Sequence, residues 1–184
     1  AFSKESGSSS TWVLSNHDVI RHATRMVIPG YGLSADGFGD ENRWYVENRL
    51  NHNLDLDLGL RRAKAASLLI MALPGSTYIY QGEELGLHDV LDIPSDQMQD
   101  PQWFRGEGKL KSRDGCRVPL PWESTGSSFG FGPGGSHLPQ PSWYADVAVS
   151  VQEQNPNSTL NLYRQALKLR SSLVTDEELT WLDS

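Results

Sequence analysis

Two short apolar runs flank a longer segment with helical periodicity. Residues 11–15, Thr-Trp-Val-Leu-Ser, and residues 76–80, Ser-Thr-Tyr-Ile-Tyr, are mainly aromatic, β-branched or apolar and do not alternate with polar residues. This pattern predicts two short strands buried on both faces. Between them, a helix is predicted that is capped by Asp57, is amphipathic at first and apolar nearly all round later, and ends at Pro74-Gly75. A strand, a helix and a strand in this order predict a parallel pair with a right-handed crossover.

The remaining segments carry weaker patterns. Residues 19–53 are rich in Gly, Asp and Asn and predict loop, with a helical turn or two at 41–50. Residues 85–157 form a very long connection, which predicts a functional or disordered segment, and residues 126–141 indicate a flexible covering loop. A last helix is predicted to begin near Ser158 and to face a core with six side chains: Leu160, Leu162, Tyr163, Ala166, Leu167 and Leu169.

The order of elements favours an α/β fold with its chemistry on loops. Oversized loops follow both predicted strands, as they do in an α/β barrel, where the site lies at the carboxyl ends of the strands. A doubly wound sheet has the same local pattern, so periodicity leaves the two architectures open. In either one, Asn16, His17 and Asp18 lie at the edge of the sheet where a ligand is met.

Composition excludes several classes of function. The 184 residues are 38% hydrophobic, enough for one ordinary core. The net charge is −7 and no run of Lys and Arg exceeds two, which argues against a nucleic-acid partner. No apolar run approaches the roughly 18 residues of a membrane span. A single cysteine, Cys116, fits a reducing compartment, so we expect a cytoplasmic protein.

No metal or cofactor site is expected. Residues 36–42, Asp-Gly-Phe-Gly-Asp-Glu-Asn, lack the ligand order of a calcium loop, and we interpret them as a solvated turn. His17 and His22 do not have the i, i+4 spacing of a helical zinc pair. Cys116 has no catalytic pattern around it and is interpreted as an incidental thiol.

Asp18 is the strongest candidate for a carboxylate that takes part in catalysis or substrate binding. Sites that cleave sugars use carboxylates as catalysts and as acceptors for ring hydroxyl groups, and they stabilise a transition state with oxocarbenium character. His17 beside it is suited to donate to a hydroxyl group. The alternative is that Asp18 caps the following turn and that His17 is a residue at the edge of the sheet whose hydrogen bonds are satisfied within the protein.

Three motifs resemble glycoside hydrolase family thirteen, the α-amylase family. Residues 12–18, WVLSNHD, look like the conserved region in which a His-Asp pair ends the seventh barrel strand. Residues 61–87, RRAKAASLLIMALPGSTYIYQGEELGL, are similar to the following helix and eighth strand in the α-glucosidase and oligo-1,6-glucosidase branch. Residues 112–124, SRDGCRVPLPWES, match a Ser-Arg-Asp segment of the same branch.

The resemblance implies specific roles. Asp18 would be the transition-state stabiliser that binds the 2- and 3-hydroxyl groups of the glucose at the cleaved bond, and His17 would bind the same sugar. Arg117 would hold the glucose at the non-reducing end, with Arg113 as a second contact; a surface salt bridge is the alternative for each arginine. Glu83, in the Gln-Gly-Glu-Glu stretch, would be architectural.

The resemblance also implies a fold and an activity. The fold class would be α/β: the C-terminal part of a (β/α)8 TIM barrel, strands seven and eight with their helices. Residues 1–175 would form this partial barrel and residues 176–184 the start of a C-terminal β domain. The activity would be that of a retaining α-glucosidase releasing glucose from short α-glucosides such as maltose or isomaltose.

Retaining hydrolysis needs two carboxyl groups about 5–5.5 Å apart. The strands that carry the family's nucleophile and acid/base are not in this sequence, so we expect a segment of a longer enzyme that is inactive by itself. Two alternatives stay open: a transglycosylating or isomerising relative, such as a trehalose synthase or a sucrose isomerase, and a non-catalytic barrel that binds a partner.

Overall fold

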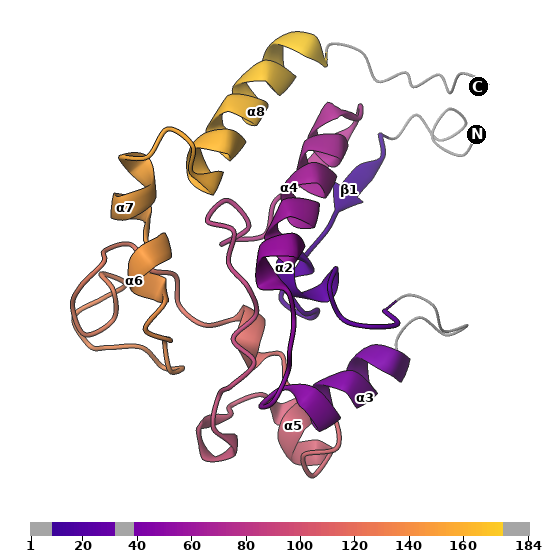
Figure 1. Cartoon of the computed structure of the whole chain (residues 1–184), viewed down its shortest axis with the longest axis vertical. Coiled ribbons are helices and arrows are strands. Elements are labelled where there is room, and N and C mark those ends of the chain that lie inside the picture. The colour runs from indigo at the N-terminus through magenta and orange to yellow at the C-terminus, as the bar shows by residue number, and fades with distance from the viewer. Residues whose placement is uncertain (1–8, 32–38, 175–184) are drawn as a thin grey trace.

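The computed structural model describes residues 9–31 and 39–174, so the predicted β domain at 176–184 lies outside the described residues. Figure 1 shows the long helices α4 and α8 in the upper half and a set of loops with short helices below and beside them. No helix in the described ranges is long and apolar enough to cross a membrane. In chain order the elements are β1 (Thr11–Val13), α2 (His22–Arg25), α3 (Gly39–Asn48), α4 (Leu56–Ala72), β2 (Ser76–Tyr78), η1 (Ser95–Gln97), α5 (Pro101–Arg105), η2 (Asp114–Cys116), α6 (Tyr144–Val147), α7 (Val149–Glu153) and α8 (Thr159–Leu173).

The predicted parallel pairing is confirmed. β1 and β2 are parallel neighbours, with Trp12 opposite Thr77. The loops that follow the two strands therefore leave from the same edge of the sheet. The prediction that both strands are buried on both faces is wrong, because Val13 is 46% and Tyr78 48% exposed. The described chain pairs these two strands with each other and places no third strand beside them.

The N-terminal cap of helix α4 lies two residues earlier than predicted. The side chain of Asp55, not Asp57, accepts a hydrogen bond from the backbone N–H of Leu58 at 2.8 Å. Asp57 lies inside the first turn, where its charge suits the positive end of the helix dipole. Gly59 lets α4 cross α2 closely, since a Cβ there would lie 2.2 Å from the carbonyl oxygen of Ala23.

The segment before α4 is more ordered than predicted. Residues 39–48 form a ten-residue helix, α3, in place of a turn or two. The solvated-turn interpretation of residues 36–42 is wrong for 39–42, which belong to α3, while residues 36–38 lie outside the described part. Tyr45 on α3 is fully buried against a small apolar cluster with Ile20, Ile28 and Leu91, which explains why this helix forms here.

Helix α8 follows its predicted cap. Ser158 accepts a hydrogen bond from the N–H of Asn161 at 3.2 Å, and Leu160, Tyr163 and Ala166 are buried. The prediction that Leu167 and Leu169 face the core is wrong: they are 42% and 57% exposed. α8 packs on one side only, against α4 and α7. The apolar stripe of α8 is consequently narrower than the sequence pattern suggests.

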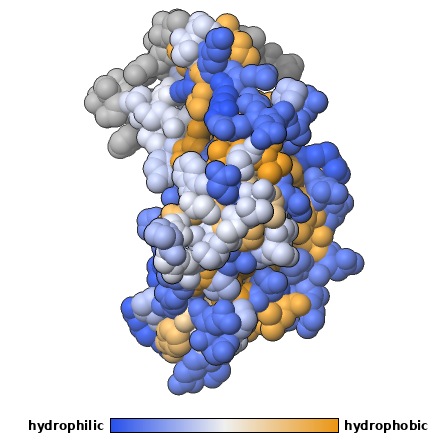
Figure 2. Space-filling model, turned by 90° about the vertical axis from the view of Figure 1, so that its left-hand side faces the viewer, coloured by the Kyte–Doolittle hydropathy of each residue, from blue (hydrophilic) through white to orange (hydrophobic). Residues whose placement is uncertain are grey.

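The face over α6, α7 and α8 is largely hydrophilic, with separate apolar patches (Figure 2).

The long connection after β2 holds a hydrophobic core of its own. Short helices and turns enclose a cluster of buried side chains drawn from across the segment and from α8: Leu85, Leu87, Val90, Ile93, Met98, Val118, Leu138, Tyr144 and Leu160. The covering loop predicted at 126–141 is packed down, since Gln140 donates to the carbonyl oxygens of Pro119 and Ser128. The segment is a folded platform for the residues at its rim.

A buried polar cluster lies between the strands and the two long helices. The hydroxyl of Ser15 lies 2.9 Å from Nδ1 of His22, and Ser67 contacts both Nε2 of His22 and the hydroxyl of Tyr163. Glu83 is 4% exposed, and neither carboxylate oxygen has a hydrogen-bond partner among the described residues. Burial lowers the pKa of His22 to about 4 and raises the pKa of Glu83 to about 7.

Glu83→Gln is expected to change how stability depends on pH. Burial raises the pKa of Glu83 from 4.5 to about 7 on folding, so its contribution to stability is full below pH 4.5 and is lost as the pH rises through about 7. Glutamine mimics the protonated acid at every pH. Urea unfolding should therefore show little difference between parent and variant at pH 4 and a variant more stable by about 3 kcal/mol at pH 8.

Glu107→Gln is the matched control, because the Glu107 side chain is 82% exposed. It should leave the pH dependence of unfolding nearly unchanged. An identical pH dependence for the parent and the Glu83→Gln protein would contradict the raised pKa of the buried Glu83.

Candidate functional site

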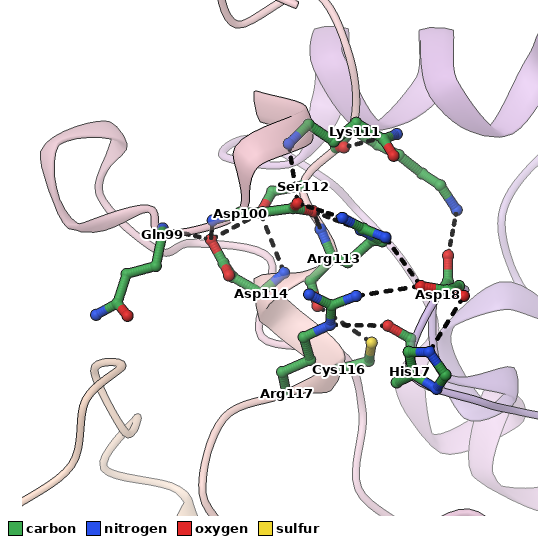
Figure 3. A network of polar contacts seen from close by, with 11 residues as sticks. His17, Asp18, Gln99, Asp100, Lys111, Ser112, Arg113, Asp114, Cys116 and Arg117 are labelled. Carbon is green, nitrogen blue, oxygen red and sulfur yellow. Dashed lines mark hydrogen bonds and ion pairs between the residues drawn. The ribbon is translucent and has the colours of Figure 1, made fainter. Parts of the chain in front are cut away.

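The loops after β1 and β2 meet at one edge of the sheet. Asp18 comes five residues after β1, and Arg113 and Arg117 flank η2 in the long segment after β2. Although about 95 residues separate them along the chain, the side chains point toward one another in Figure 3. The parallel pairing of the strands is the local reason for this meeting, because it sends both loops to the same side.

Asp18 is the centre of the cluster. Its Oδ1 accepts from Nη1 of Arg113 at 3.0 Å and from Nη2 of Arg117 at 3.1 Å, and its Oδ2 lies 3.3 Å from Nε2 of His17. The side chain is 51% exposed. Its slight burial raises the pKa of the carboxyl, but the hydrogen bond from Arg113 and the nearby charges outweigh this and lower the pKa. Asp18 is therefore an ionised carboxylate open to solvent at neutral pH.

Arg113 is held from behind by a buried carboxylate. Asp100 accepts from Nε of Arg113 at 2.8 Å, from Nη2 at 2.7 Å and from its backbone N–H at 2.7 Å. Burial raises the pKa of Asp100, but the hydrogen bonds from Arg113 and Gln102 hold it well below its usual range. The same pair raises the pKa of Arg113. Two parallel N–H···O bonds fix the guanidinium plane.

Arg117 approaches Asp18 from the other end of η2. Its Nε donates to the carbonyl oxygen of His17 at 2.8 Å, while its Nη2 reaches Oδ1 of Asp18. The guanidinium thus contacts the backbone and the side chain of the His17-Asp18 pair together. About a quarter of the Arg117 side chain is exposed, which leaves it accessible to a ligand beside Asp18.

Further polar contacts support the loop under these residues. Nζ of Lys111 donates to Oε1 of the buried Glu41 at 2.6 Å and lies 3.4 Å from the backbone oxygen of Asp18. Asp114 accepts from the hydroxyl of Ser112 and from the backbone N–H groups of Gln99 and Asp100. These bonds set the path of the backbone from which Arg113 extends.

Arg21 ties the two loops together in the interior. It is 1% exposed, and its guanidinium donates to the carbonyl oxygens of Gln81 at 2.7 Å and Cys116 at 2.9 Å. Its backbone N–H donates to Oδ2 of the buried Asp89 at 2.8 Å. A Cβ at Gly115 would lie 2.0 Å from Oδ1 of Asp89, so this position requires glycine. The loop bearing Asp18 is therefore fixed to the loop bearing the arginines.

The described residues bring together no three His, Cys, Asp or Glu side chains able to hold a metal ion. Cys116 is buried, its thiol lies 3.1 Å from the carbonyl oxygen of Arg113, and burial raises its pKa to about 12. A thiol with so high a pKa is a poor nucleophile. The chemistry of the site is that of one carboxylate with cationic donors around it, an arrangement suited to binding a neutral polyhydroxyl ligand.

All four residues singled out from the sequence, His17, Asp18, Arg113 and Arg117, lie in this cluster. Both arginines form ion pairs, as the alternative interpretation required, but their shared partner is Asp18 itself. The alternative that Asp18 caps the following turn is not supported, because the described contacts of its carboxylate are with the side chains of Arg113, Arg117 and His17 and not with a backbone N–H of that turn.

Sequence reasoning missed Asp100, Lys111 and Glu41. Asp100 had one local signal, its position before Pro101, which is typical of a helix cap. Its side chain does accept from the N–H of Gln102 at the start of α5. The contact with Arg113 joins residues 13 apart across an irregular loop, and no periodic pattern marks such a pair.

Comparison with known proteins identifies the family of the chain. Residues 40–177 match the family model described as alpha amylase, catalytic domain. The chain is 35% identical over 161 residues to a probable alpha-glucosidase of Rhizobium meliloti (strain 1021), covering 88% of this chain and 24% of that protein. It is 27% identical over 174 residues to an oligo-1,6-glucosidase of Parageobacillus thermoglucosidasius, covering 85% of this chain and 26% of the relative.

Among solved structures, the crystal structure of an alpha-glucosyl transfer enzyme, XgtA, matches with a TM-score of 0.67 and 31% identity, over 92% of this chain and 26% of that one. The chain thus spans about a quarter of the length of these relatives. Because the family model covers more than half of the sequence, and curated and solved relatives align along most of it, the chain belongs to the α-amylase family.

Proposed function

We propose that this chain is the C-terminal part of the catalytic barrel of an α-glucosidase that releases glucose from short α-glucosides with retention. β1 and β2 would be the seventh and eighth strands of a (β/α)8 barrel. Their parallel pairing and the long loops at their carboxyl ends support this placement. Similarity to a probable alpha-glucosidase and to an oligo-1,6-glucosidase supports the substrate class.

The observation that carries the proposal is the state of Asp18. It is ionised, half exposed, and held by two guanidinium groups at the edge where a barrel enzyme meets its substrate. Such a carboxylate stabilises positive charge as it develops at the anomeric carbon and accepts hydrogen bonds from neighbouring hydroxyl groups. His17, Arg117 and Arg113 would bind the same glucosyl unit around it.

The proposal assigns the nucleophile and the acid/base to other parts of the longer polypeptide. Asp18 is paired with cations, whereas a general acid needs a raised pKa. Glu83 has a raised pKa, but it is 4% exposed and lies in the interior cluster with His22, where it is closed off from solvent. A cytoplasmic location is part of the proposal and rests on the presence of one cysteine, which is buried.

Asp18→Asn in the full-length protein is expected to lower kcat on maltose and isomaltose by about 10²–10³-fold, a loss of about 3–4 kcal/mol of transition-state stabilisation. Asparagine keeps the size and one acceptor oxygen but loses the charge. The temperature of unfolding should change little, because the side chain is half exposed. Steady-state kinetics and thermal unfolding measure both quantities.

Asp92→Asn is the control, since Asp92 is an exposed aspartate in the long segment after β2 and has no described contact with the Asp18 cluster. Its turnover should equal that of the parent. An Asp18→Asn protein that releases glucose at the parent rate would contradict the assigned role.

A second candidate is glucosyl transfer, which the similarity to XgtA favours at 31% identity. Both reactions pass through the same glucosyl transition state and differ in whether water or a sugar hydroxyl accepts the glucosyl group. Incubation of the full-length protein with maltose, followed by chromatography, separates them. A hydrolase releases both glucosyl units of each maltose as glucose. A transferase releases only the leaving-group glucose and adds the other glucosyl unit to a sugar acceptor, so longer glucosides accumulate beside the glucose.

A further inference from the structure

We infer that Asp100 is a positioning residue of this site, which acts through Arg113 to fix the carboxylate of Asp18 so that Oδ2 faces the substrate. The inference rests on the proposed role of Asp18 and adds a residue that the sequence motifs do not mark. Figure 3 shows the Arg113 guanidinium between Asp100 on one side and Asp18 on the other.

The first step is the rigidity of the anchor. Asp100 is 1% exposed and receives Arg113 through three nitrogens, the backbone N–H, Nε and Nη2, at 2.7–2.8 Å. It also accepts from the N–H of Gln102 at 2.9 Å, which seats it at the start of α5. A guanidinium held by a bidentate carboxylate and by its own backbone has little freedom to turn.

The second step is the direction of Nη1, the guanidinium nitrogen of Arg113 that does not bind Asp100. With Nε and Nη2 occupied by Asp100, Nη1 of Arg113 points at Oδ1 of Asp18 at 3.0 Å. Nη2 of Arg117 reaches the same oxygen at 3.1 Å, while its Nε is held by the His17 carbonyl oxygen. Two fixed donors on one oxygen define the rotation of the carboxylate. Oδ2, approached by His17 at 3.3 Å, is left as the oxygen presented to the site.

The third step is why a site needs such an anchor. The Asp18 side chain is 51% exposed, so packing alone does not fix its orientation. A carboxylate that stabilises a transition state must be oriented before the reaction, since a displacement of about 1 Å can cost about a hundredfold in rate. The buried Asp100 fixes the planar guanidinium of Arg113, and this guanidinium in turn fixes the orientation of the exposed Asp18 carboxylate.

Asp100→Asn tests the inference in the full-length protein. Asparagine keeps one acceptor oxygen for the start of α5 but loses the charge and one of the two oxygens that bind the guanidinium. With maltose as substrate we expect kcat to fall about 10- to 100-fold while KM changes less than about threefold, since uniform binding is largely retained. The decisive measurement introduces Asp100→Asn into the Asp18→Asn protein. If Asp100 acts through Asp18, the added substitution should change the residual kcat of the Asp18→Asn protein by less than about threefold.

Gln152→Ala controls for damage to the fold of the segment after β2. Gln152 is also buried there, and its side chain donates to the carbonyl oxygens of Leu85 and Val147 and accepts from the backbone N–H of Leu160, none of which belongs to the Asp18 cluster. We expect it to lower the temperature of unfolding while kcat stays within about threefold of the parent. If Asp100→Asn does not fold, Arg113→Lys replaces it, because lysine keeps the charge without the planar fork. The same loss of kcat and the same coupling to Asp18 are expected.

The outcomes separate this inference from the proposed function. An unchanged kcat in Asp100→Asn, or in Arg113→Lys, together with an impaired Asp18→Asn protein overturns the role of Asp100 alone. An equal loss in both backgrounds also overturns it, because the effect would then be a general one on the fold. An active Asp18→Asn protein overturns the proposed function instead.

Discussion

The buried guanidinium of Arg21 is the interaction on which the rest of the site depends. It donates to the carbonyl oxygens of Gln81, just after β2, and Cys116, within η2, while its backbone is held by Asp89. Moving a charged group out of water is costly unless new hydrogen bonds replace those to water. The two carbonyl oxygens satisfy Nη1 and Nη2 of Arg21, while its Nε has no hydrogen-bond partner among the described residues. Arg21 follows Asp18 by three residues, so these bonds hold the loop that bears Asp18 beside the loop that bears the arginines.

The arrangement of Asp18, Arg113 and Arg117 depends on the contacts of Arg21 together with two further features of the fold. The parallel pairing of β1 and β2 brings both loops to one edge, Arg21 joins them, and η2 directs Arg113 and Arg117 at Asp18 from two sides. The result is a carboxylate kept ionised by its neighbours but still half exposed. Under the proposed function, this carboxylate would stabilise the positive charge that develops on a bound sugar.

The sequence was most informative where the governing interactions are local. The two strands, the helix between them and the cap at Ser158 each depend on residues within a few positions of one another. The parallel pairing of the strands is not local, but a strand, a helix and a strand in this order predict it. The structure confirms these elements and the pairing. The cap of α4 was assigned to Asp57 when it is Asp55, because both stand in the same Asp-Leu-Asp-Leu stretch and either fits the pattern. Exposure of Val13 and Leu169 was not predictable, since it depends on which elements are present to cover them. Asp100 was missed because its partner lies across an irregular loop.

The most direct test of the central claim is a crystal structure of the full-length protein with a cationic glucose mimic such as 1-deoxynojirimycin. We expect Oδ2 of Asp18 to lie within about 3 Å of a hydroxyl group of the bound ring, with Arg113 and Arg117 still donating to Oδ1. A ring bound elsewhere, or Asp18 turned away from it toward the protein interior, would contradict the account.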